Sequence, residues 1–276
     1  MSTRTLIVAL ACFIFPVAVA LGQQTPLASP IPVASQSQVD CTGFIAATKV
    51  STDIIVSAGA DNDFESYLHQ FSTGDFVYLS SQGNARVSLG DQFSLVRPAK
   101  VLFRTTRYGG EHWNVRDLGT PYEDAGRVQV THMTPQGAVA QVRFACGPIY
   151  PGDLAVPYQP RPIPTYVPTE LDRFALPNGN IEGTIVAARD NFFSLAKGDI
   201  VYLNFGAKQG AEVGQRYRVY YSLPPRGVFR AWFSYPEQPR ETVGEIVVLA
   251  TQEKSASAII VNCTRDITLG YGVQLE

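Results

Sequence analysis

Short runs in which apolar and polar residues alternate recur along most of the chain, and turn residues separate them. "GDFVYL" at 74–79 and "GDIVYL" at 198–203 are two such runs, each opened by Gly-Asp. Runs of this length, rich in β-branched and aromatic residues and bounded by Gly, Asp and Pro, predict strands. No long window shows the 3.6-residue period of an amphipathic helix. The pattern therefore predicts an all-β protein built from small barrels or sandwiches.

A repeat is the second feature of the pattern. Residues 74–96 align without a gap on residues 198–220, and the turn glycines and apolar positions coincide. Further along the chain, Gly126 matches Gly244. A segment that recurs with its turns and apolar pattern intact is one supersecondary unit used twice. The sequence thus predicts two related β domains in tandem.

The same alignment sets where each copy starts and ends. "TGFIAATKV" at 42–50 matches "EGTIVAARD" at 182–190, so we expect each to be an opening strand. Residues 51–66 are then extra to the first copy, where they are expected to add a hairpin. At the other end, Cys263 is the counterpart of Cys146.

Two segments poor in apolar periodicity divide the chain. Residues 23–38, rich in Pro, Ser and Gln, predict a disordered, flexible tether. Residues 157–179 are rich in proline, which predicts an extended and semi-rigid linker that acts as a spacer. The first β-barrel-like repeat then spans 39–156 and the second spans 180–276.

An apolar run at residues 5–21 follows the single positive residue Arg4. The run is shorter than a membrane span requires, and Pro16 interrupts it. Small residues follow at spacings that suit a signal peptidase, so residues 1–22 are expected to be a cleaved signal peptide. An uncleaved N-terminal anchor is the alternative, and only then would the protein contact a membrane. Either way, the sequence predicts an exported protein in the periplasm or outside the cell.

Gly-Asp pairs stand before several of the predicted strands. Gly can adopt the positive φ that ends a turn, and the Asp oxygen can accept from nearby backbone amides. Calcium binding is the other reading of such aspartates, but they occur one per turn without an EF-hand or nonapeptide spacing. We therefore expect a structural role at Gly74-Asp75, Gly90-Asp91, Gly152-Asp153 and Gly198-Asp199.

The net charge of the chain mainly excludes one class of partner. Charged residues make up 17% of the chain, and 22 Lys and Arg residues nearly balance 24 Asp and Glu residues. A chain this close to neutral lacks the basic surface that attracts phosphate backbones. Nucleic acid is therefore not expected among the partners.

Removal of the signal leaves three cysteines, Cys41, Cys146 and Cys263. Disulfides persist in the oxidising compartments that exported proteins reach. Cys41 opens the first repeat and Cys146 closes it, and a closed β unit would bring these ends together. The sequence thus favours a Cys41–Cys146 disulfide, with Cys146–Cys263 as the rival pairing. An unpaired Cys263 would act as a small buried apolar residue.

The repeated pattern resembles a known module. G-D-x-V-Y-L, a Gly-containing turn, V-G-x-x-[FY]-x-V-Y, G-x-[IV]-x-V and a closing A-x-[IV]-x-x-[CS] are similar to a small β-barrel of bacterial envelope proteins. Such a module occurs in the C-terminal domain of flagellar assembly protein T and follows LysM modules in other envelope proteins. Gln215 and Tyr271 depart from the pattern, because Asp is expected there. The resemblance implies a non-catalytic module of the exported envelope.

Signatures of catalysis or metal binding do not emerge from the sequence. The histidines, His69, His112 and His132, lie in separate segments without metal-ligand spacing. The chain contains no HExxH, CxxC or G-x-S-x-G motif. We therefore expect no catalytic residues, no metal and no cofactor.

Both tryptophans of the chain lie in equivalent inserts, at 98–122 and 223–240, together with arginines and other aromatic residues. Trp, Tyr and Arg on loops that project from a rigid scaffold dominate recognition sites. Aromatic faces stack on sugar rings or peptide side chains, and Arg grips carboxylates. The simpler reading is that each Trp closes the open end of its own barrel. The candidate binding residues are Trp113, Arg107 and Tyr108 in the first insert, and Trp232, Arg230 and Phe233 in the second.

These observations predict an exported protein that binds or scaffolds at the cell envelope without turning over a substrate. The expected partner is another envelope protein or a polysaccharide, contacted through the Trp-bearing inserts. One alternative is an accessory hydrolase or transferase whose site lies between the two domains. Another is a purely structural spacer.

Overall fold

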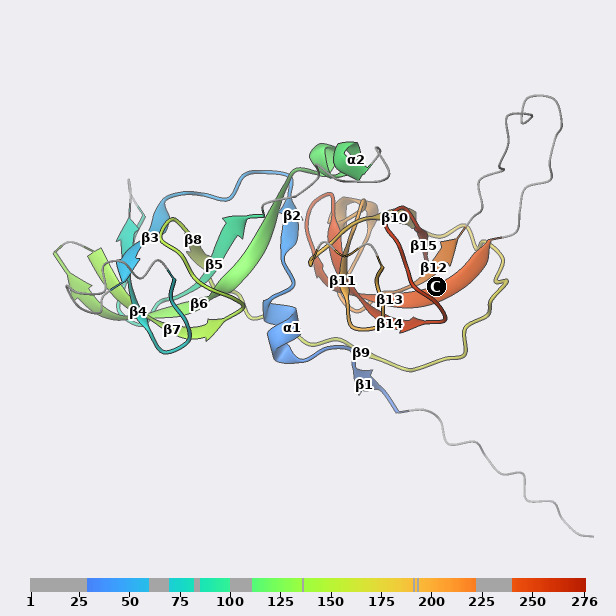
Figure 1. The fold of residues 1–276 in the computed structure, drawn as a ribbon, viewed down its shortest axis with the longest axis horizontal. Coiled ribbons are helices and arrows are strands. Elements are labelled where there is room, and N and C mark those ends of the chain that lie inside the picture. Colours follow the sequence, from blue (N-terminus) through green and yellow to red (C-terminus); the bar gives the residue numbers. More distant parts are fainter. Residues whose placement is uncertain are drawn as a thin grey trace, which may run out of the picture.

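The computed structural model confirms an all-β protein with two six-stranded barrels in tandem (Figure 1). The signal-peptide prediction at residues 1–22, residues 100–110 of the first insert and residues 223–239 of the second lie outside the part of the chain that the structure describes. Side chains at 58, 59 and 111–114 lie outside it as well. The described residues are 29–59, 70–81, 85–99, 111–135, 137–190, 192, 194–221 and 240–276.

Barrel 1 is a sheet of antiparallel strands in the spatial order β3-β4-β7-β6-β5-β8, and pairing of β8 with β3 closes it. A further short strand, β2 (Phe44–Ala46), pairs with the first residues of β6. The barrel strands are β3 (Ile54–Gly59), β4 (Phe76–Ser81), β5 (Gln92–Pro98), β6 (Thr120–Thr134), β7 (Gly137–Ala145) and β8 (Leu154–Pro157).

Barrel 2 has the same order, β10-β11-β14-β13-β12-β15, and β15 pairs with β10 to close it. Each strand therefore has a counterpart in barrel 1, from β3 and β10 to β8 and β15. A short 3-10 helix, η2 (Ala207–Gln209), follows β11. The strands are β10 (Glu182–Ala188), β11 (Ile200–Leu203), β12 (Arg216–Tyr221), β13 (Glu241–Thr251), β14 (Ala256–Cys263) and β15 (Gly272–Leu275).

Three glycine turns in each barrel fasten the start of a strand to its neighbour. Gly198 donates its N–H to the Ile260 carbonyl, and the Ile260 N–H donates to the Asp199 carbonyl. The other five turns repeat this pair of bonds. Each glycine has a positive φ, which favours glycine because a side chain there would be strained. The six glycines are Gly74, Gly90, Gly152, Gly198, Gly214 and Gly270.

The structural role expected for the Gly-Asp pairs is confirmed. Asp75, Asp91, Asp153 and Asp199 each accept the amide N–H three residues earlier, at 2.7, 2.8, 2.9 and 2.8 Å. Gln215 replaces Asp but keeps this bond, since its Oε1 accepts the Glu212 amide at 3.0 Å. The backbone bonds of the turn therefore recur at six places, and five of the six add this side-chain bond, which Tyr271 at the sixth turn does not make to any described residue.

The predicted opening strand of the first copy is wrong. The barrel strand equivalent to β10 is β3, within the stretch that we expected to be an extra hairpin. Residues 44–46 instead form β2, which lies outside the closed ring of strands. The stretches "TGFIAATKV" and "TDIIVSAG" have similar apolar patterns, so a Gly-based alignment selects the wrong one. The insertion in copy one is therefore the segment before β3.

The match between Cys263 and Cys146 is also wrong, by one residue. The Cys146 amide donates to Ala125, and the equivalent amide in barrel 2 is that of Thr264, which donates to Val243. Cys263 corresponds to Ala145, because these two residues pair with Gly244 and Gly126 respectively. A shift of one residue moves a strand side chain to the opposite face of the sheet. Cys263 is thus a free, half-buried cysteine that packs against the core of barrel 2.

The expected tether contains secondary structure. Strand β1 (Ile31–Pro32) and helix α1 (Gln36–Asp40) form within or next to it, and Ser35 caps α1 by accepting the Gln38 amide. Strand β1 pairs with β9 (Thr165–Tyr166) of the proline-rich segment. The described residues contain no helix long and apolar enough to cross a membrane.

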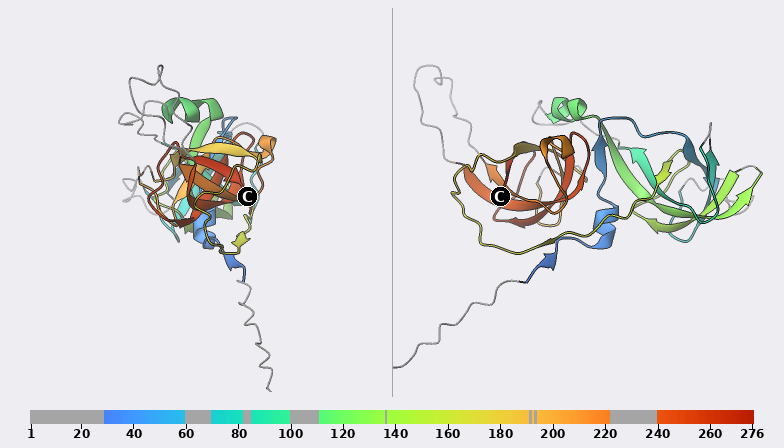
Figure 2. Two further views of the ribbon diagram at one scale, coloured as in Figure 1. Left: turned by 90° about the vertical axis from the view of Figure 1, so that its right-hand side faces the viewer. Right: turned by 180° about the vertical axis from the view of Figure 1, so that it is seen from behind.

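The proline-rich segment does not hold the barrels apart. It runs along the outside of barrel 2 (Figure 2), where the Thr242 amide donates to the Arg173 carbonyl. Arg216 and Arg218 of β12 donate to the carbonyls of Val167 and Leu176. Proline has no backbone N–H, so a proline-rich segment cannot form a regular ladder of backbone hydrogen bonds. Its carbonyls accept from barrel 2 instead, and these bonds hold the segment on the barrel surface.

Candidate functional site at the junction of the barrels

Residues 35–46, which we call the bridging segment, lie between the barrels and contact both (Figure 1). On the side of barrel 1, a disulfide joins Cys41 to Cys146 with a Cα–Cα distance of 5.5 Å. The favoured pairing of the two predicted is thus the one present. Since β2 also pairs with β6, covalent and hydrogen bonds both fix this segment to barrel 1.

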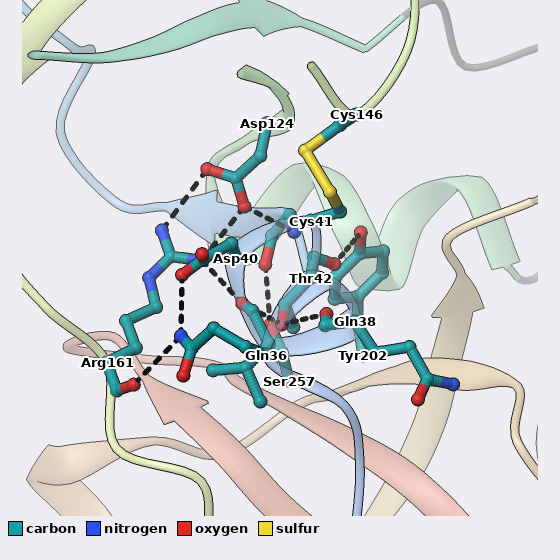
Figure 3. A network of polar contacts seen from close by, with 12 residues as sticks. Gln36, Gln38, Asp40, Cys41, Thr42, Asp124, Cys146, Arg161, Tyr202 and Ser257 are labelled. Atoms are coloured by element: carbon teal, nitrogen blue, oxygen red, sulfur yellow. Dashed lines mark hydrogen bonds and ion pairs between the residues drawn. A yellow bond between two sulfur atoms is a disulfide. The ribbon is translucent and has the colours of Figure 1, made fainter. Parts of the chain in front are cut away.

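Asp124 of β6 is the centre of a polar network beside the disulfide (Figure 3). Its Oδ2 accepts the Gly43 amide at 2.8 Å, and Arg161 of the proline-rich segment donates to both carboxylate oxygens at 2.9 and 3.2 Å. The Asp124 side chain is only 3% exposed. Arg161 also donates to the Val39 carbonyl, so one ion pair joins β6, the bridging segment and the linker. The neighbouring carboxylate raises the pKa of Arg161 against the opposing effect of burial.

On the side of barrel 2, three side chains donate to the backbone of the bridging segment. Tyr202 of β11 donates its hydroxyl to the Thr42 carbonyl at 3.0 Å. Ser257 of β14 donates to Gly43 at 2.9 Å, and Ser255 donates to Ile45 at 2.8 Å. Burial raises the pKa of Tyr202 far above its ordinary value, so the phenol remains a donor. These bonds satisfy three carbonyls of the bridging segment, of which only that of Ile45 belongs to β2.

Gly43 is required where these contacts converge. Its φ is +68°, and a Cβ at this position would lie 2.4 Å from the Tyr202 hydroxyl oxygen and 2.9 Å from the Tyr122 carbonyl oxygen. Both the conformation and the close approach therefore exclude larger residues. The glycine that the sequence matched with Gly183 instead lets barrel 2 approach the bridging segment.

Helix α2 (Glu111–Leu118), part of the first Trp-bearing insert, also lies at the junction. Val115 and Leu118 pack with Ile45 of the bridging segment and with Val186 and Tyr202 of barrel 2. The first insert therefore extends from barrel 1 and contacts barrel 2. Its apolar contacts add to the hydrogen bonds of the bridging segment.

A cleft of ≈ 670 Å³ with both polar and apolar lining residues opens beside the disulfide. We call it the interdomain cleft, because barrel 1, the bridging segment and barrel 2 all contribute to its walls. Clefts between domains are preferred places for ligand binding. Its lining includes Cys41, Arg97, Glu123, Tyr150, Arg189 and Asp190.

Arg97 organises the barrel 1 wall of the interdomain cleft. Its Nη2 donates to the Pro148 carbonyl and, at 3.1 Å, to Asp153, and its guanidinium lies 4.7 Å from the centre of the Tyr150 ring. Burial raises the pKa of Asp153, although the Tyr150 amide and Arg97 both act to lower it. The Nε of Arg97 is buried and has no hydrogen-bond partner among the described residues.

Barrel 2 contributes an ion pair to the opposite part of the cleft. Arg189 donates through Nε and Nη2 to both oxygens of Asp190, at 2.6 to 3.1 Å. The bond to Asp190 raises the pKa of Arg189. The cleft therefore offers guanidinium donors and carboxylate acceptors that largely neutralise each other.

The predicted binding residues fall mostly outside the described residues. Trp113 lies in the first turn of α2, but its side chain is not among the described ones. The structure thus neither joins these residues into one site nor separates them. The residues outside the described part are Arg107, Tyr108, Arg230, Phe233 and Trp232.

Metal binding has no candidate cluster in the described part of the chain, where no three His, Cys, Asp or Glu side chains converge. Of the described residues that line the interdomain cleft, none is a histidine or a free cysteine. His132 lies in β6 with its ring next to the Thr131 hydroxyl.

Sequence reasoning missed the residues that build the junction. Arg161 is the only charged residue between 157 and 169, and a lone charge among prolines was a usable signal of a buried partner. Asp124 stands where barrel 2 has Thr242, a second signal that the copies differ here. Tyr202 and Ser257 carried no such signal, because Tyr and Ser are ordinary in strands.

Comparison with known proteins adds no relative. No family model matches the chain, and no curated protein matches it.

Proposed function

We propose that this chain is an exported, non-catalytic protein of the cell envelope that binds or scaffolds a partner between and around its two barrels. The observation that carries the proposal is the bridging segment, which a disulfide and the Asp124 network join to barrel 1 and three hydroxyl donors join to barrel 2. Such bonding fixes the geometry of a binding surface before any partner arrives, which lowers the entropy cost of binding.

Export is part of the proposal and has two supports. The apolar run at residues 5–21 is typical of a secretory signal, and disulfides persist in oxidising compartments. We expect the mature protein in the periplasm or outside the cell. Fractionation with an antibody against the barrels tests this, and recovery of the reduced, full-length chain in the cytoplasm would contradict it.

The partner is proposed to be an envelope protein or a polysaccharide that contacts the Trp-bearing inserts and the junction. Helix α2, which carries Trp113, packs over the junction through Val115 and Leu118, so this insert and the interdomain cleft belong to one region of the molecule. The resemblance to envelope modules points the same way.

A pull-down from envelope extracts tests the binding role. The wild-type protein should retain a partner, and the Trp113→Ala/Trp232→Ala variant should retain much less of it. Both proteins must show the same melting temperature. The same set of recovered molecules from both, or none from either, would contradict a binding role through the inserts.

A further inference from the structure

We infer that the interdomain cleft binds a neutral, polyhydroxylated ligand, that is, a segment of a saccharide chain. This inference rests on the binding role proposed above and names the class of ligand. It follows from the balance of charge in the cleft, from the polar groups left without a partner, and from one exposed aromatic ring.

The charges of the cleft favour a neutral ligand. Arg97 is paired with Asp153, Arg189 with Asp190, and Asp124 with Arg161. Glu123 is the exposed acidic residue left over, and no other described residue bonds its carboxylate. A strongly anionic ligand would meet no excess positive charge, and a cation would find one exposed carboxylate, which binds weakly in water.

The paired groups still have hydrogen-bonding capacity that no described residue uses. Arg97 uses Nη2 and Arg189 uses Nε and Nη2, so Nη1 of each has no partner among the described residues. The carboxylates of Asp190 and Glu123 can accept further bonds, because an ionised carboxylate accepts about four. A ligand that both accepts from guanidinium groups and donates to carboxylates matches this set. Sugar hydroxyl groups do both at once.

Tyr150 supplies the apolar component that a sugar ring needs. Its side chain belongs to an exposed residue, with 37% of its surface accessible, and Arg97 lies over the ring. Arg97 covers one face of the ring, and Tyr150 is among the residues that line the interdomain cleft. Aromatic faces stack on the apolar faces of sugars, and the charged groups Arg97, Arg189, Glu123 and Asp190 line the same cleft.

Titration calorimetry with defined hexasaccharides tests the inference on the full, oxidised chain. The neutral probes are hexamers of N-acetylglucosamine, β-1,4-linked glucose and α-1,4-linked glucose. A hexamer of galacturonic acid and a neutral hexapeptide complete the set. At least one neutral saccharide should bind saturably, with the acid and the peptide weaker. No saturable binding of any neutral hexamer, or tighter binding of the acid or the peptide, would overturn the inference.

Variants locate the binding in the cleft. Tyr150→Ala should weaken the affinity roughly tenfold, while Tyr150→Phe keeps the ring and should leave it unchanged. Arg189→Ala removes donors from the opposite wall and should also weaken binding. The matched control is Tyr221→Ala. Tyr221 lies outside the cleft, and the Arg265 guanidinium lies over its ring as that of Arg97 lies over Tyr150. Equal affinities of Tyr150→Ala and wild type, or an equal loss in Tyr221→Ala, would refute the site.

The two proposals fail differently. If Tyr150→Ala still retains its partner in the envelope pull-down and the wild type binds no hexasaccharide, the saccharide inference is wrong and the binding role stands. If neither protein retains a partner from the extract and a neutral hexamer still binds the wild type in a Tyr150-dependent manner, the inference stands and the role of the inserts is wrong.

Discussion

The two barrels share every strand pairing but differ on the outer face of equivalent strands. In barrel 1 this face carries Gln129, Gln141 and Arg143, which are half-buried or exposed. Arg143 donates to Gln129 at 3.0 Å and to Gln141 at 2.6 Å, and the two glutamine amides donate to glycine carbonyls of the turns. The face is a polar network that water can reach.

In barrel 2 the equivalent positions are Val247, Ile259 and Val261, all at most 3% exposed. Val39 of the bridging segment packs on them, with Ile163 and Tyr166 of the proline-rich segment nearby. Apolar residues on the inner face are therefore common to both barrels and form their cores. The residues on the outer face differ, and only an apolar outer face is covered by other segments of the chain. These strands of barrel 2 are apolar on both faces, because the bridging segment and the proline-rich segment bury their outer face as the core buries their inner face.

Loss of the disulfide should have the largest effect on this arrangement. Barrel 2 has Thr264 where barrel 1 has Cys146, so this crosslink is specific to the bridging segment of barrel 1. The sequence separation is 105 residues, for which loop-closure entropy gives about 4–5 kcal/mol. Denaturant unfolding of Cys41→Ser/Cys146→Ser should show that loss, while Cys263→Ala should cost about 1 kcal/mol. Equal stabilities of the double variant and wild type would contradict the role of the crosslink.

Asp124→Ala should have the second-largest effect on the free energy of unfolding, because it leaves the Arg161 guanidinium and the Gly43 amide without their acceptor. Removing one partner of a buried ion pair costs about 3–4 kcal/mol. The control Asp190→Ala breaks an exposed pair and should cost less than about 1 kcal/mol. Chemical denaturation measures both, and a similar small loss in the two variants would show that the Asp124 network does not hold the junction.

Equivalent truncations on the two outer faces test the comparison itself. Leu249 of barrel 2 is 1% exposed, and its counterpart in barrel 1 is the half-buried Thr131. Leu249→Ala should destabilise the protein by about 2–3 kcal/mol, since a cavity forms under the bridging and proline-rich segments, which we call the covering segments. Thr131→Ala should change the free energy of unfolding by about 0.5 kcal/mol. Similar values for both would mean that the covering segments do not pack closely on barrel 2.

A smaller effect is expected from pH, which should change the stability of the protein through Glu245 of barrel 2. Burial first, and then Glu276, raises the pKa of Glu245 above its ordinary value of 4.5, although Arg216 and Thr169 lower it. The folded protein then holds this proton more tightly than the unfolded chain does. Its contribution to stability is therefore largest at low pH and falls as the pH rises from about 4.5 through the raised pKa.

Glu245→Gln should remove that part of the decline. The amide oxygen can still accept from Thr169, which lies 3.1 Å from Glu245 Oε1. The matched control is Glu170→Gln, because Glu170 is exposed on the same covering segment. Thermal melts from pH 4 to pH 8 measure the slope. Parallel profiles for wild type and Glu245→Gln would contradict the assignment.

Much of the fold could be predicted from the sequence, because turns and inner faces repeat. Glycine turns and alternating apolar residues are local signals, and they recur at six places with the same spacing. The opening strand could not be placed, since residues 42–50 and 53–59 both suit a half-buried strand. Only closure of the barrel decides between them, and closure is a long-range property.

The junction could be predicted only in part. The favoured Cys41–Cys146 pairing followed from the expected closure of the first copy, and the structure confirms it. The continuous apolar runs of β13 and β14 were a signal of burial on both faces, in contrast to the alternation of β6 and β7. Which segment covers them depends on packing between parts of the chain far apart in sequence.

The bridging segment, bonded to both barrels, should make the two barrels tumble as one rigid body. Backbone ¹⁵N relaxation of the oxidised protein tests it most directly, because amides in both barrels report their own rotational diffusion. A single diffusion tensor should fit β3–β8 and β10–β15 together. Two tensors with separate and shorter correlation times would contradict the claim.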